Sequence, residues 1–400
     1  MRLVVVGNGV AGVTAAMAVR ASDPRADITI ISGESEYFFS RTGLMYAYMD
    51  VMQRRDLEPY ERKVYREQRL ERRLDWVVDL DAGERTVRLA GGESLRYDRL
   101  LLATGSRGRR AAWERELDGV VRLVTLQDLD ACERWTPGTQ RAVVAGGGLI
   151  GVELAECLLY HRVPVTFLVR EASYWPAALS AEEGAMVAGH LRAQGVDLRL
   201  ETEIASLEGE GRVSGVTTRA GERIACEMVG VTIGVEPNSD WLRRVKTPPA
   251  LGRGVVTDRA FRTSLPGVYA AGDCAEVAGR IEPLWYAAKR QGEAAARAML
   301  GEPVEYTPPT YYNSAKFFHL EWTGVGETAA GPGRFRKLPG REASVRVIER
   351  EGVVVGFSML GSRWNHRVLA RWVEERRRVE EVVSRLYEAQ YDGEFGRVVL

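Results

Sequence analysis

Three glycines near the N-terminus have the spacing of a turn that binds a pyrophosphate group. Gly7, Gly9 and Gly12 directly follow the apolar run 1–6. In such a turn the first glycine makes the bend, the second lets a phosphate approach the backbone, and the third lets a helix pack on the strand. The free N–H groups and the positive dipole end of that helix then favour an anion. The spacing therefore predicts a dinucleotide-binding site.

An acidic residue stands where a dinucleotide site needs a carboxylate for a ribose hydroxyl. A second strand pattern covers 27–31, and Glu34 follows it, 22 positions after Gly12. This distance fits the carboxylate that accepts a hydrogen bond from the ribose. The alternative is a solvated loop charge, which would carry no role in binding.

The same arrangement occurs a second time, about 139 residues further along. A strand pattern over 141–145 leads into Gly146, Gly148 and Gly151, then a helical stretch from about 150 to 160 and a strand over 165–169. Two complete units are far more specific than one, because each needs a strand, a turn, a helix and a strand in that order. The chain is therefore predicted to bind two dinucleotides.

Further apolar strands end in glycine, where open parallel sheets bind ligands. The strand over 100–105 ends in Ala103, Thr104 and Gly105, and a later strand ends at Gly234. A third strand leads into Gly272 and Asp273, with an Ala-rich helix predicted over 285–300.

The composition excludes several classes of protein. The 400 residues contain 55 basic and 55 acidic side chains, so no overall field favours nucleic acid or an anionic membrane. No apolar stretch reaches the roughly 18 residues of a spanning helix, and the first strand leaves no room for a signal peptide. The four cysteines form no close pair, so neither a disulfide framework nor a metal site is expected. A cytoplasmic protein is the default expectation.

The remaining segments give simpler patterns. We expect a helix over 57–73, a strand over 315–322, a hairpin formed by 344–348 and 353–359, and a long charged closing helix over 367–389. The arginine run 376–378 lies among glutamates, which favours a solvated helix face over a nucleic-acid contact.

Taken together, these motifs resemble the FAD-dependent pyridine-nucleotide oxidoreductases with two dinucleotide-binding domains, which are related to glutathione reductase. The resemblance covers residues 1–301, three quarters of the chain. It implies an α/β fold with two Rossmann-like domains and a C-terminal α+β interface domain. The FAD domain would comprise 1–113 and 247–305, the inserted NAD(P) domain 114–246, and the interface domain 306–400. It also implies a homodimer formed through that last domain.

The resemblance assigns cofactor-binding roles to the residues at the motif positions. On the FAD side these are Gly7, Gly9, Val10, Ala11, Gly12, Glu34, Arg41, Thr42, Val78, Ala103, Thr104, Gly105, Gly272, Asp273, Leu284 and Trp285. On the nicotinamide side they are Gly146, Gly148, Leu149, Ile150, Gly151, Glu153, Arg170 and Gly234.

Two of these residues would act beyond simple binding. By the resemblance, Glu153 reaches the nicotinamide carboxamide and the flavin edge and is the candidate catalytic residue; the alternative is an acid placed in the first helical turn by the dipole. Cofactor choice follows the second strand, where Val169 replaces the acid typical of NAD-specific relatives and Arg170 follows it. This pattern favours NADPH, or loose discrimination between NADPH and NADH, and Glu171 could reverse the choice.

The branch of the family is indicated by the segment after Glu34. Phe39, Arg41 and Leu44 match the pattern of ferredoxin- and rubredoxin-reductase-like flavoproteins, whereas Met45-Tyr46 replaces a Ser-Lys pair of many relatives. Ser40 and Arg41 stand where relatives with thiol chemistry carry cysteine. Because thiol exchange needs a thiolate, a redox disulfide relay is excluded, and Cys274 is predicted to be structural.

These observations predict an FAD-dependent NAD(P)H:acceptor oxidoreductase without a bound metal. A hydride would pass from NADH or NADPH to FAD, and electrons would then reach an external acceptor: a small electron-transfer protein such as ferredoxin or rubredoxin, a quinone, or oxygen. A membrane-associated quinone reductase is one alternative. A second alternative, from another class, is a redox-sensing flavoprotein whose main role is to bind partners.

Overall fold

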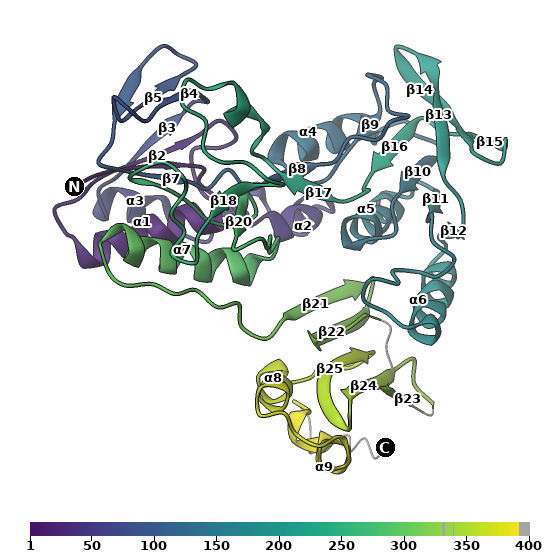
Figure 1. Ribbon diagram of the computed structural model, residues 1–400. Coiled ribbons are helices and arrows are strands. Elements are labelled where there is room, and N and C mark those ends of the chain that lie inside the picture. The colour runs from purple at the N-terminus through teal and green to yellow at the C-terminus, as the bar shows by residue number, and fades with distance from the viewer. Residues whose placement is uncertain (330–332, 339, 392–400) are drawn as a thin grey trace. The chain divides into compact units, whose positions relative to one another are not determined.

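The computed structural model describes residues 1–329, 333–338 and 340–391 (Figure 1). The chain divides into two compact units. The first comprises Met1–Arg109, Val124–Asp130 and Val235–Thr307, and the second comprises Arg110–Leu123, Ala131–Gly234 and Pro308–Leu400. The α/β class is confirmed, whereas the division into three domains stays a prediction.

The first unit is built on a parallel five-stranded sheet with the order β19-β7-β1-β2-β3. Apolar β-branched and leucine side chains fill these strands and form the core against α1 and α7, which lie side by side (Figure 1). Its elements are β1 (Arg2–Val6), α1 (Val10–Ser22), β2 (Asp27–Ser32), α2 (Leu44–Tyr48), α3 (Arg62–Glu67), β3 (Leu70–Leu74), β4 (Val77–Asp81), β5 (Thr86–Leu89), β6 (Ser94–Arg96), β7 (Arg99–Leu102), β8 (Ser106–Gly108), β17 (Val235–Pro237), β18 (Val255–Thr257), β19 (Val268–Ala270), β20 (Ala275–Val277) and α7 (Trp285–Met299), with 3₁₀ turns at Arg41–Gly43, Arg54–Leu57 and Asp240–Arg244.

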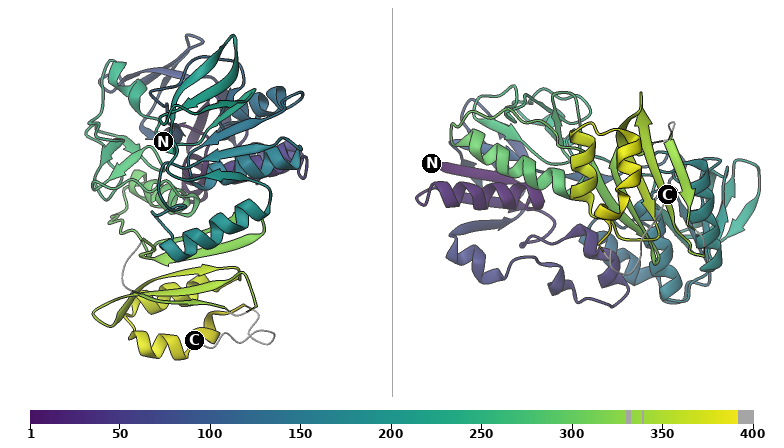
Figure 2. Two further views of the ribbon diagram at one scale, coloured as in Figure 1. Left: turned by 90° about the vertical axis from the view of Figure 1, so that its right-hand side faces the viewer. Right: turned by 90° about the horizontal axis from the view of Figure 1, so that it is seen from below.

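The second unit repeats this plan with a parallel sheet of order β12-β11-β10-β16-β9 and adds an antiparallel sheet of order β21-β22-β25-β24-β23. The helix α6 packs on one face of the antiparallel sheet and α8 with α9 on the other (Figure 2). Its elements are β9 (Val120–Val121), α4 (Leu126–Trp135, whose first five residues belong to the first unit), β10 (Ala142–Ala145), α5 (Leu149–Tyr160), β11 (Val165–Leu168), α6 (Ala181–Ala193), β12 (Asp197–Arg199), β13 (Ile204–Glu210), β14 (Arg212–Thr218), β15 (Arg223–Ala225), β16 (Met228–Val231), β21 (Tyr312–Phe317), β22 (Leu320–Gly326), β23 (Gly333–Lys337), β24 (Ser344–Arg350), β25 (Val353–Leu360), α8 (His366–Glu374), α9 (Val379–Ser384) and a 3₁₀ turn at Leu386–Ala389.

A buried ion pair fixes α6 to the antiparallel sheet. Arg346 of β24 donates to Glu183 of α6 at 2.9 Å, and both side chains are almost fully buried. The same guanidinium donates to the carbonyl oxygens of Ala178 and Thr328. Removing one partner of such a pair leaves an uncompensated charge, so this contact holds the two layers together.

Three sequence-based expectations about elements were wrong. The helix over 57–73 is shorter, because Leu70–Leu74 pairs with β2 as a parallel edge strand and this tertiary pairing overrides helix propensity. The strand over 315–322 is a hairpin that turns at Phe318, whose φ is +58°.

The prediction of one long closing helix over 367–389 was also wrong. The stretch forms α8, α9 and a 3₁₀ turn instead of one helix. It breaks after α8, because Arg376 has a φ of +53° and the N–H of Val379 donates to the carbonyl oxygen of Gly352. The hairpin over 344–359 is present as β24 and β25.

Candidate functional site

The first glycine turn leaves room for a ligand at one of its three glycines. Gly7 has a φ of +112°, and a Cβ there would lie 2.1 Å from the carbonyl oxygen of Ala103. A Cβ on Gly12 would lie 2.0 Å from the carbonyl oxygen of Gly7. A Cβ on Gly9 would meet nothing within 4 Å. The protein itself therefore fills the space at the first and third positions, and the open space lies where a pyrophosphate would approach the backbone.

The N-terminus of α1 is left uncapped by side chains. Gly9 is its N-cap residue and makes no side-chain cap, and no acidic residue stands in the first turn, which contains Val10 and Ala11. The first intrahelical donor is Val13, which bonds to the carbonyl of Gly9 at 3.0 Å. The preceding N–H groups and the helix dipole can therefore hold a phosphate.

Glu34 is held by its neighbours on this side of the sheet. Arg41 pairs with both of its carboxylate oxygens, and the backbone N–H of Leu126 donates to Oε1 at 3.1 Å. Arg41 also donates to the carbonyl oxygen of Val124 at 2.6 Å. Glu34 is thus not a solvated loop charge, and its bond to a ribose stays a prediction.

The loop after β7 and the end of β19 contribute the next group. Asp273 accepts a hydrogen bond from the Ser106 hydroxyl at 2.8 Å, and burial raises the pKa of its carboxyl group. Thr104 donates its hydroxyl proton to the carbonyl of Asn238 at 2.7 Å. Gly272 has a φ of +81°, which lets the chain turn at this strand end.

The other residues that the resemblance assigns to FAD binding belong to the same first unit. Leu284 is the N-cap residue of α7 and Trp285 its first residue, with 37% of the Trp285 side chain exposed. Thr42 bonds with Ser40 through their hydroxyl groups at 3.0 Å. Val78 lies on β4 and is 42% exposed.

The second glycine turn reproduces the geometry of the first. Gly146 has a φ of +118°, and a Cβ there would lie 2.4 Å from the carbonyl oxygen of Thr232. A Cβ on Gly151 would lie 2.2 Å from the carbonyl oxygen of Gly146, whereas one on Gly148 would meet nothing within 4 Å. The helix α5 starts at Leu149 with no side-chain cap and no acid in its first turn. This turn therefore has space for a second phosphate beside Ile150, and Gly234 (φ +99°) lies just beyond the end of the neighbouring strand β16.

Glu153 lies on α5, two residues beyond Gly151. Burial, together with the smaller effect of the neighbouring Glu156 carboxylate, raises its pKa to about 7. At neutral pH this carboxyl group is therefore divided between its acid and its anion, so it can donate or accept a hydrogen bond.

The shifted pKa predicts a pH-dependent stability. An unfolded chain releases this proton near its ordinary value of 4.5, so the folded chain binds more protons between about pH 4.5 and 7, and stability falls as pH rises through that window. The variant Glu153→Gln removes the ionisable group, and with it the free-energy cost of holding a buried carboxylate in its charged form above pH 7. We expect it to exceed the wild type by about 3 kcal/mol at pH 8 and by less than about 1 kcal/mol at pH 5. Denaturant unfolding at both values measures this, and equal differences at the two values would contradict it.

The residues predicted to set the choice between NADH and NADPH follow β11. Val169, at the position of the ribose-binding acid of NAD-specific relatives, has no carboxylate, and its side chain is fully buried. Arg170 is exposed and pairs with Glu171 through Nε at 3.2 Å and a terminal nitrogen at 2.8 Å. The charge available to a 2′-phosphate is thus partly neutralised by the adjacent carboxylate.

Sequence patterns missed two residues that position the first glycine turn and its surroundings. Asn8 donates its side-chain amide to the carbonyl of Ser35 at 2.6 Å and so ties the first turn to the loop after β2. The buried Gln291 accepts the backbone N–H of Gly272 at 2.8 Å. Asn8 stands inside the first glycine turn, and this position is the sequence signal that could have found it. Gln291 belongs to no short motif and became recognisable only from the position of α7 beside Gly272.

The cysteines take no part in a redox pair. All four are buried and none forms a disulfide. Burial raises the pKa of the Cys274 thiol, whose sulfur lies 3.4 Å from the carbonyl oxygen of Leu102. In the part of the chain that the structure describes, no cluster of three or more His, Cys, Asp or Glu side chains is arranged to hold a metal. Within the same residues, no helix has the length and apolar character needed to span a bilayer.

The fold and the two open turns define a protein with two dinucleotide-binding units. The model of the pyridine nucleotide-disulphide oxidoreductase family matches residues 1–292, and the chain belongs to that family. It is an oxidoreductase of the type that uses FAD and a nicotinamide dinucleotide, and the residues around both turns fit these cofactors.

Individual relatives refine this result. The ferredoxin reductase component of chlorobenzene dioxygenase from a Cupriavidus species is 31% identical over 393 residues, covering 94% of this chain and 93% of that protein. The rubredoxin-NAD(+) reductase of Pseudomonas putida is 29% identical over 339 residues, covering 81% and 87%. The crystal structure of a covalent putidaredoxin reductase–putidaredoxin complex matches with a TM-score of 0.85 at 23% identity, covering 94% of this chain and 93% of that chain, which shows a shared fold.

Proposed function

We propose that this protein passes electrons from NADH or NADPH through FAD to a small iron–sulfur protein of the ferredoxin type. The observation that carries the proposal is the pair of open glycine turns in a chain whose four cysteines are all buried and form no disulfide. When bound, FAD supplies the ability to take a hydride and release its electrons one at a time. The printed names of the relatives, a ferredoxin reductase component and a rubredoxin reductase, support an external protein acceptor.

The chain's own residues have distinct tasks in this proposal. The turn at Gly9 with α1 binds the FAD pyrophosphate, and Glu34 binds its ribose. The turn at Gly148 with α5 binds the nicotinamide dinucleotide. Glu153 contacts the nicotinamide carboxamide, because its carboxyl group can donate or accept there near neutral pH. A cytoplasmic homodimer remains part of the proposal.

Steady-state turnover with a panel of acceptors tests this function. Wild-type protein with NADH or NADPH should reduce a [2Fe–2S] ferredoxin, followed by coupled reduction of cytochrome c, faster than it consumes oxygen or reduces a quinone. Rubredoxin is the second protein acceptor to compare. Oxygen consumption that matches NADH consumption in the presence of ferredoxin would favour an oxidase. Slow turnover with every acceptor, together with a nucleotide-dependent change in assembly, would favour the redox-sensing alternative.

The Arg170–Glu171 pair predicts how nucleotide choice can be changed. In the variant Glu171→Ala, the guanidinium of Arg170 is released from its partner and becomes available to a 2′-phosphate. We expect the KM for NADPH to fall about tenfold and the KM for NADH to change less than about twofold. The variant Arg170→Ala should raise the KM for NADPH instead. Equal changes of both KM values would contradict this assignment.

A further inference from the structure

The first unit has a basic cavity at the outer edge of its parallel sheet. The cavity has a volume of about 500 Å³ and is formed by α3, by the edge strand β3 and by the segment after β2. Its described lining residues are Tyr37, Arg62, Lys63, Arg66, Leu70, Glu71 and Arg72. Four of these residues are cations and one is an acid, so the cavity is suited to an anion.

The fold brings the four cations together from two elements. Arg62 and Arg66 stand four positions apart on α3 and therefore share one face of that helix, with Lys63 beside them. The helix packs against β3, which carries Arg72. Because β3 is the last strand of its sheet, the side of the strand that faces away from β2 is left for this cavity.

The ring of Tyr37 holds two of the guanidinium groups in place. The Cζ atoms of Arg62 and Arg72 lie 4.5 and 4.8 Å from its centroid, and the ring of Tyr65 meets it edge to face at 5.3 Å. Arg62 also donates to Glu58 through Nε at 2.9 Å and Nη2 at 2.6 Å, which leaves its Nη1 without a partner in the described part of the chain. Donors that are already fixed bind a ligand at a lower entropic cost.

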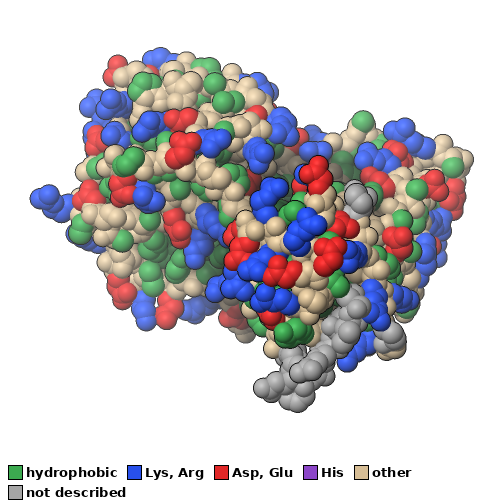
Figure 3. Space-filling view, turned by 60° about the horizontal axis from the view of Figure 1, so that its bottom comes forward, with side chains coloured by type: hydrophobic (Ala, Val, Ile, Leu, Met, Phe, Trp, Pro, Cys, Tyr) green, Lys and Arg blue, Asp and Glu red, His purple; other side chains and the backbone are tan. Residues whose placement is uncertain are grey.

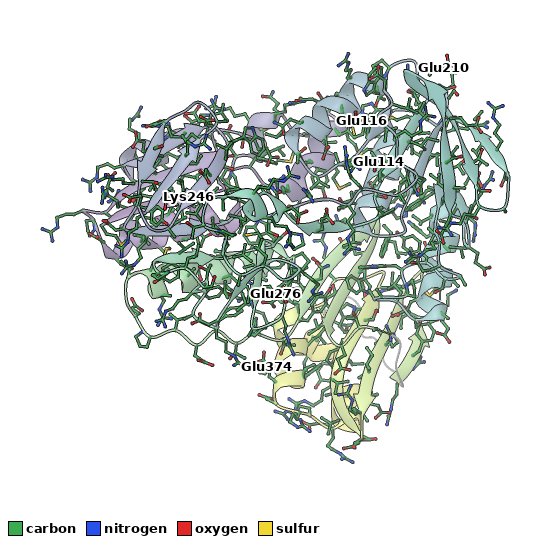
Figure 4. The ribbon with its side chains drawn as sticks, turned by 45° about the horizontal axis from the view of Figure 1, so that its top comes forward. Glu114, Glu116, Glu210, Lys246, Glu276 and Glu374 are labelled. Carbon is green, nitrogen blue, oxygen red and sulfur yellow. The ribbon has the colours of Figure 1, made fainter. Side chains whose placement is uncertain are left out.

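Arg66 adds positive charge that the chain does not neutralise. Its side chain is exposed and makes no hydrogen bond or ion pair with any residue that the structure describes. Elsewhere the charges are mixed: Figure 3 shows basic and acidic side chains interspersed over the face that it draws. Lys246, labelled in Figure 4, pairs with Asp81 at 2.6 Å. An unpaired guanidinium in the wall of a cavity can instead donate to a bound anion.

The acids near the cavity do not cancel its charge. Glu71, the one acid among the described lining residues, pairs with Arg73 at 2.6 Å. Glu67 of α3 is exposed and is not part of the lining. Three more acids outside the lining each pair with one lining cation: Glu36 with Arg72, Glu58 with Arg62 and Glu61 with Lys63. Because Lys63 and Glu61 are both exposed, their ion pair is weak in water and Lys63 can turn to a ligand.

The cavity is separate from the predicted cofactor sites. None of the described lining residues is among those assigned to FAD or to the nicotinamide dinucleotide. Open parallel sheets bind dinucleotides at the carboxyl ends of their strands. The cavity is instead lined by the first three residues of β3, which runs from Leu70 to Leu74.

We propose that this α3–β3 cavity binds an oligophosphate chain, either as free inorganic triphosphate or as the triphosphate group of a nucleotide. Guanidinium groups present paired N–H donors that match phosphate oxygens. Several cations in one cavity favour a ligand with several negative charges, and the volume is that of a small-molecule site. The site is additional to the proposed electron transfer and does not depend on it.

Calorimetric titration with inorganic triphosphate tests the proposal. The FAD-loaded protein is used with saturating NAD⁺, so that neither glycine turn is open to the phosphate chain. We expect one triphosphate to bind per chain, with a Kd that rises with salt because the charges are then screened. Arg66→Glu should raise this Kd at least ~10-fold, and Lys63→Glu at least ~5-fold, because each places a carboxylate among the remaining cations.

Two controls separate this cavity from other anion contacts. Arg96→Glu makes the same charge change at an exposed residue of β6 outside the lining and should bind triphosphate like the wild type. Gly148→Asp blocks the second glycine turn and should also bind it normally. A titration with ATP distinguishes the two sources: a Kd equal to or above that of triphosphate identifies the free chain, and a lower Kd identifies the nucleotide.

Three results would overturn the proposal. The first is a wild-type protein that binds no triphosphate. The second is normal binding by both Arg66→Glu and Lys63→Glu, with melting temperatures equal to that of the wild type. The third is an equal loss of affinity in Arg96→Glu, or a loss confined to Gly148→Asp, which would assign the binding to the overall charge or to the second turn.

Discussion

The variant Gly9→Asp should fold but should not retain FAD. The backbone of Gly9 has a φ of −72° and a ψ of −173°, which any residue can adopt, and a Cβ there meets no atom within 4 Å. A carboxylate at this position would occupy the space of the pyrophosphate and repel its charge. We expect the affinity for FAD to fall at least ~1000-fold, about 4 kcal/mol. Titration of the apoprotein with FAD, followed by flavin fluorescence, measures this loss.

A control variant keeps the experiment specific. A Cβ on Gly189 of α6 would likewise meet nothing within 4 Å, and this exposed residue lies outside both glycine turns. Gly189→Asp should bind FAD like the wild type, and the two apoproteins should unfold at similar temperatures. Retention of FAD by Gly9→Asp would show that the first turn does not hold the pyrophosphate.

The variant Gly148→Asp should retain FAD and lose its reduction by nicotinamide nucleotides. Gly148 has the same open, extended geometry in the second unit, with a φ of −93° and a ψ of −173°. The introduced carboxylate would exclude the pyrophosphate of NADH or NADPH. We expect kcat/KM for either nucleotide to fall at least ~1000-fold, about 4 kcal/mol, with a normal flavin spectrum.

Chemical reduction with dithionite is the control for this variant, because it bypasses nucleotide binding. The flavin of Gly148→Asp should then bleach as in the wild type. Loss of FAD from this variant, or normal reduction by NADH, would mean that the roles of the two turns are wrongly assigned. If each unit binds its own dinucleotide, Gly9→Asp loses FAD, whereas Gly148→Asp keeps FAD and loses only its reduction by NADH and NADPH.

The glycine turns could be predicted because their requirements are local. A positive φ at Gly7 and Gly146 and the close approaches at Gly12 and Gly151 permit almost no other residue, so the sequence carries them openly. The family and the absence of a disulfide relay follow from the same kind of local signal, and both are confirmed.

The elements and contacts set by distant pairing could not be predicted in this way. Residues 70–74 have helical neighbours in sequence, yet they form an edge strand because β2 offers an unpaired row of hydrogen-bonding groups. The bonds from Gln291 to Gly272 and from Ser106 to Asp273 join residues 19 and 167 positions apart. No motif spans such separations, so positioning residues of this kind become visible only in the folded chain.

The measurement that tests the central claim most directly is anaerobic rapid mixing of the FAD-loaded protein with NADH and, separately, with NADPH. The visible absorption band of the flavin is followed in time. The account predicts that at least one nucleotide bleaches this band within seconds, and the faster one identifies the physiological donor. If neither nucleotide bleaches the flavin within minutes, the protein is not an NAD(P)H-dependent reductase, and a role in binding or sensing takes its place.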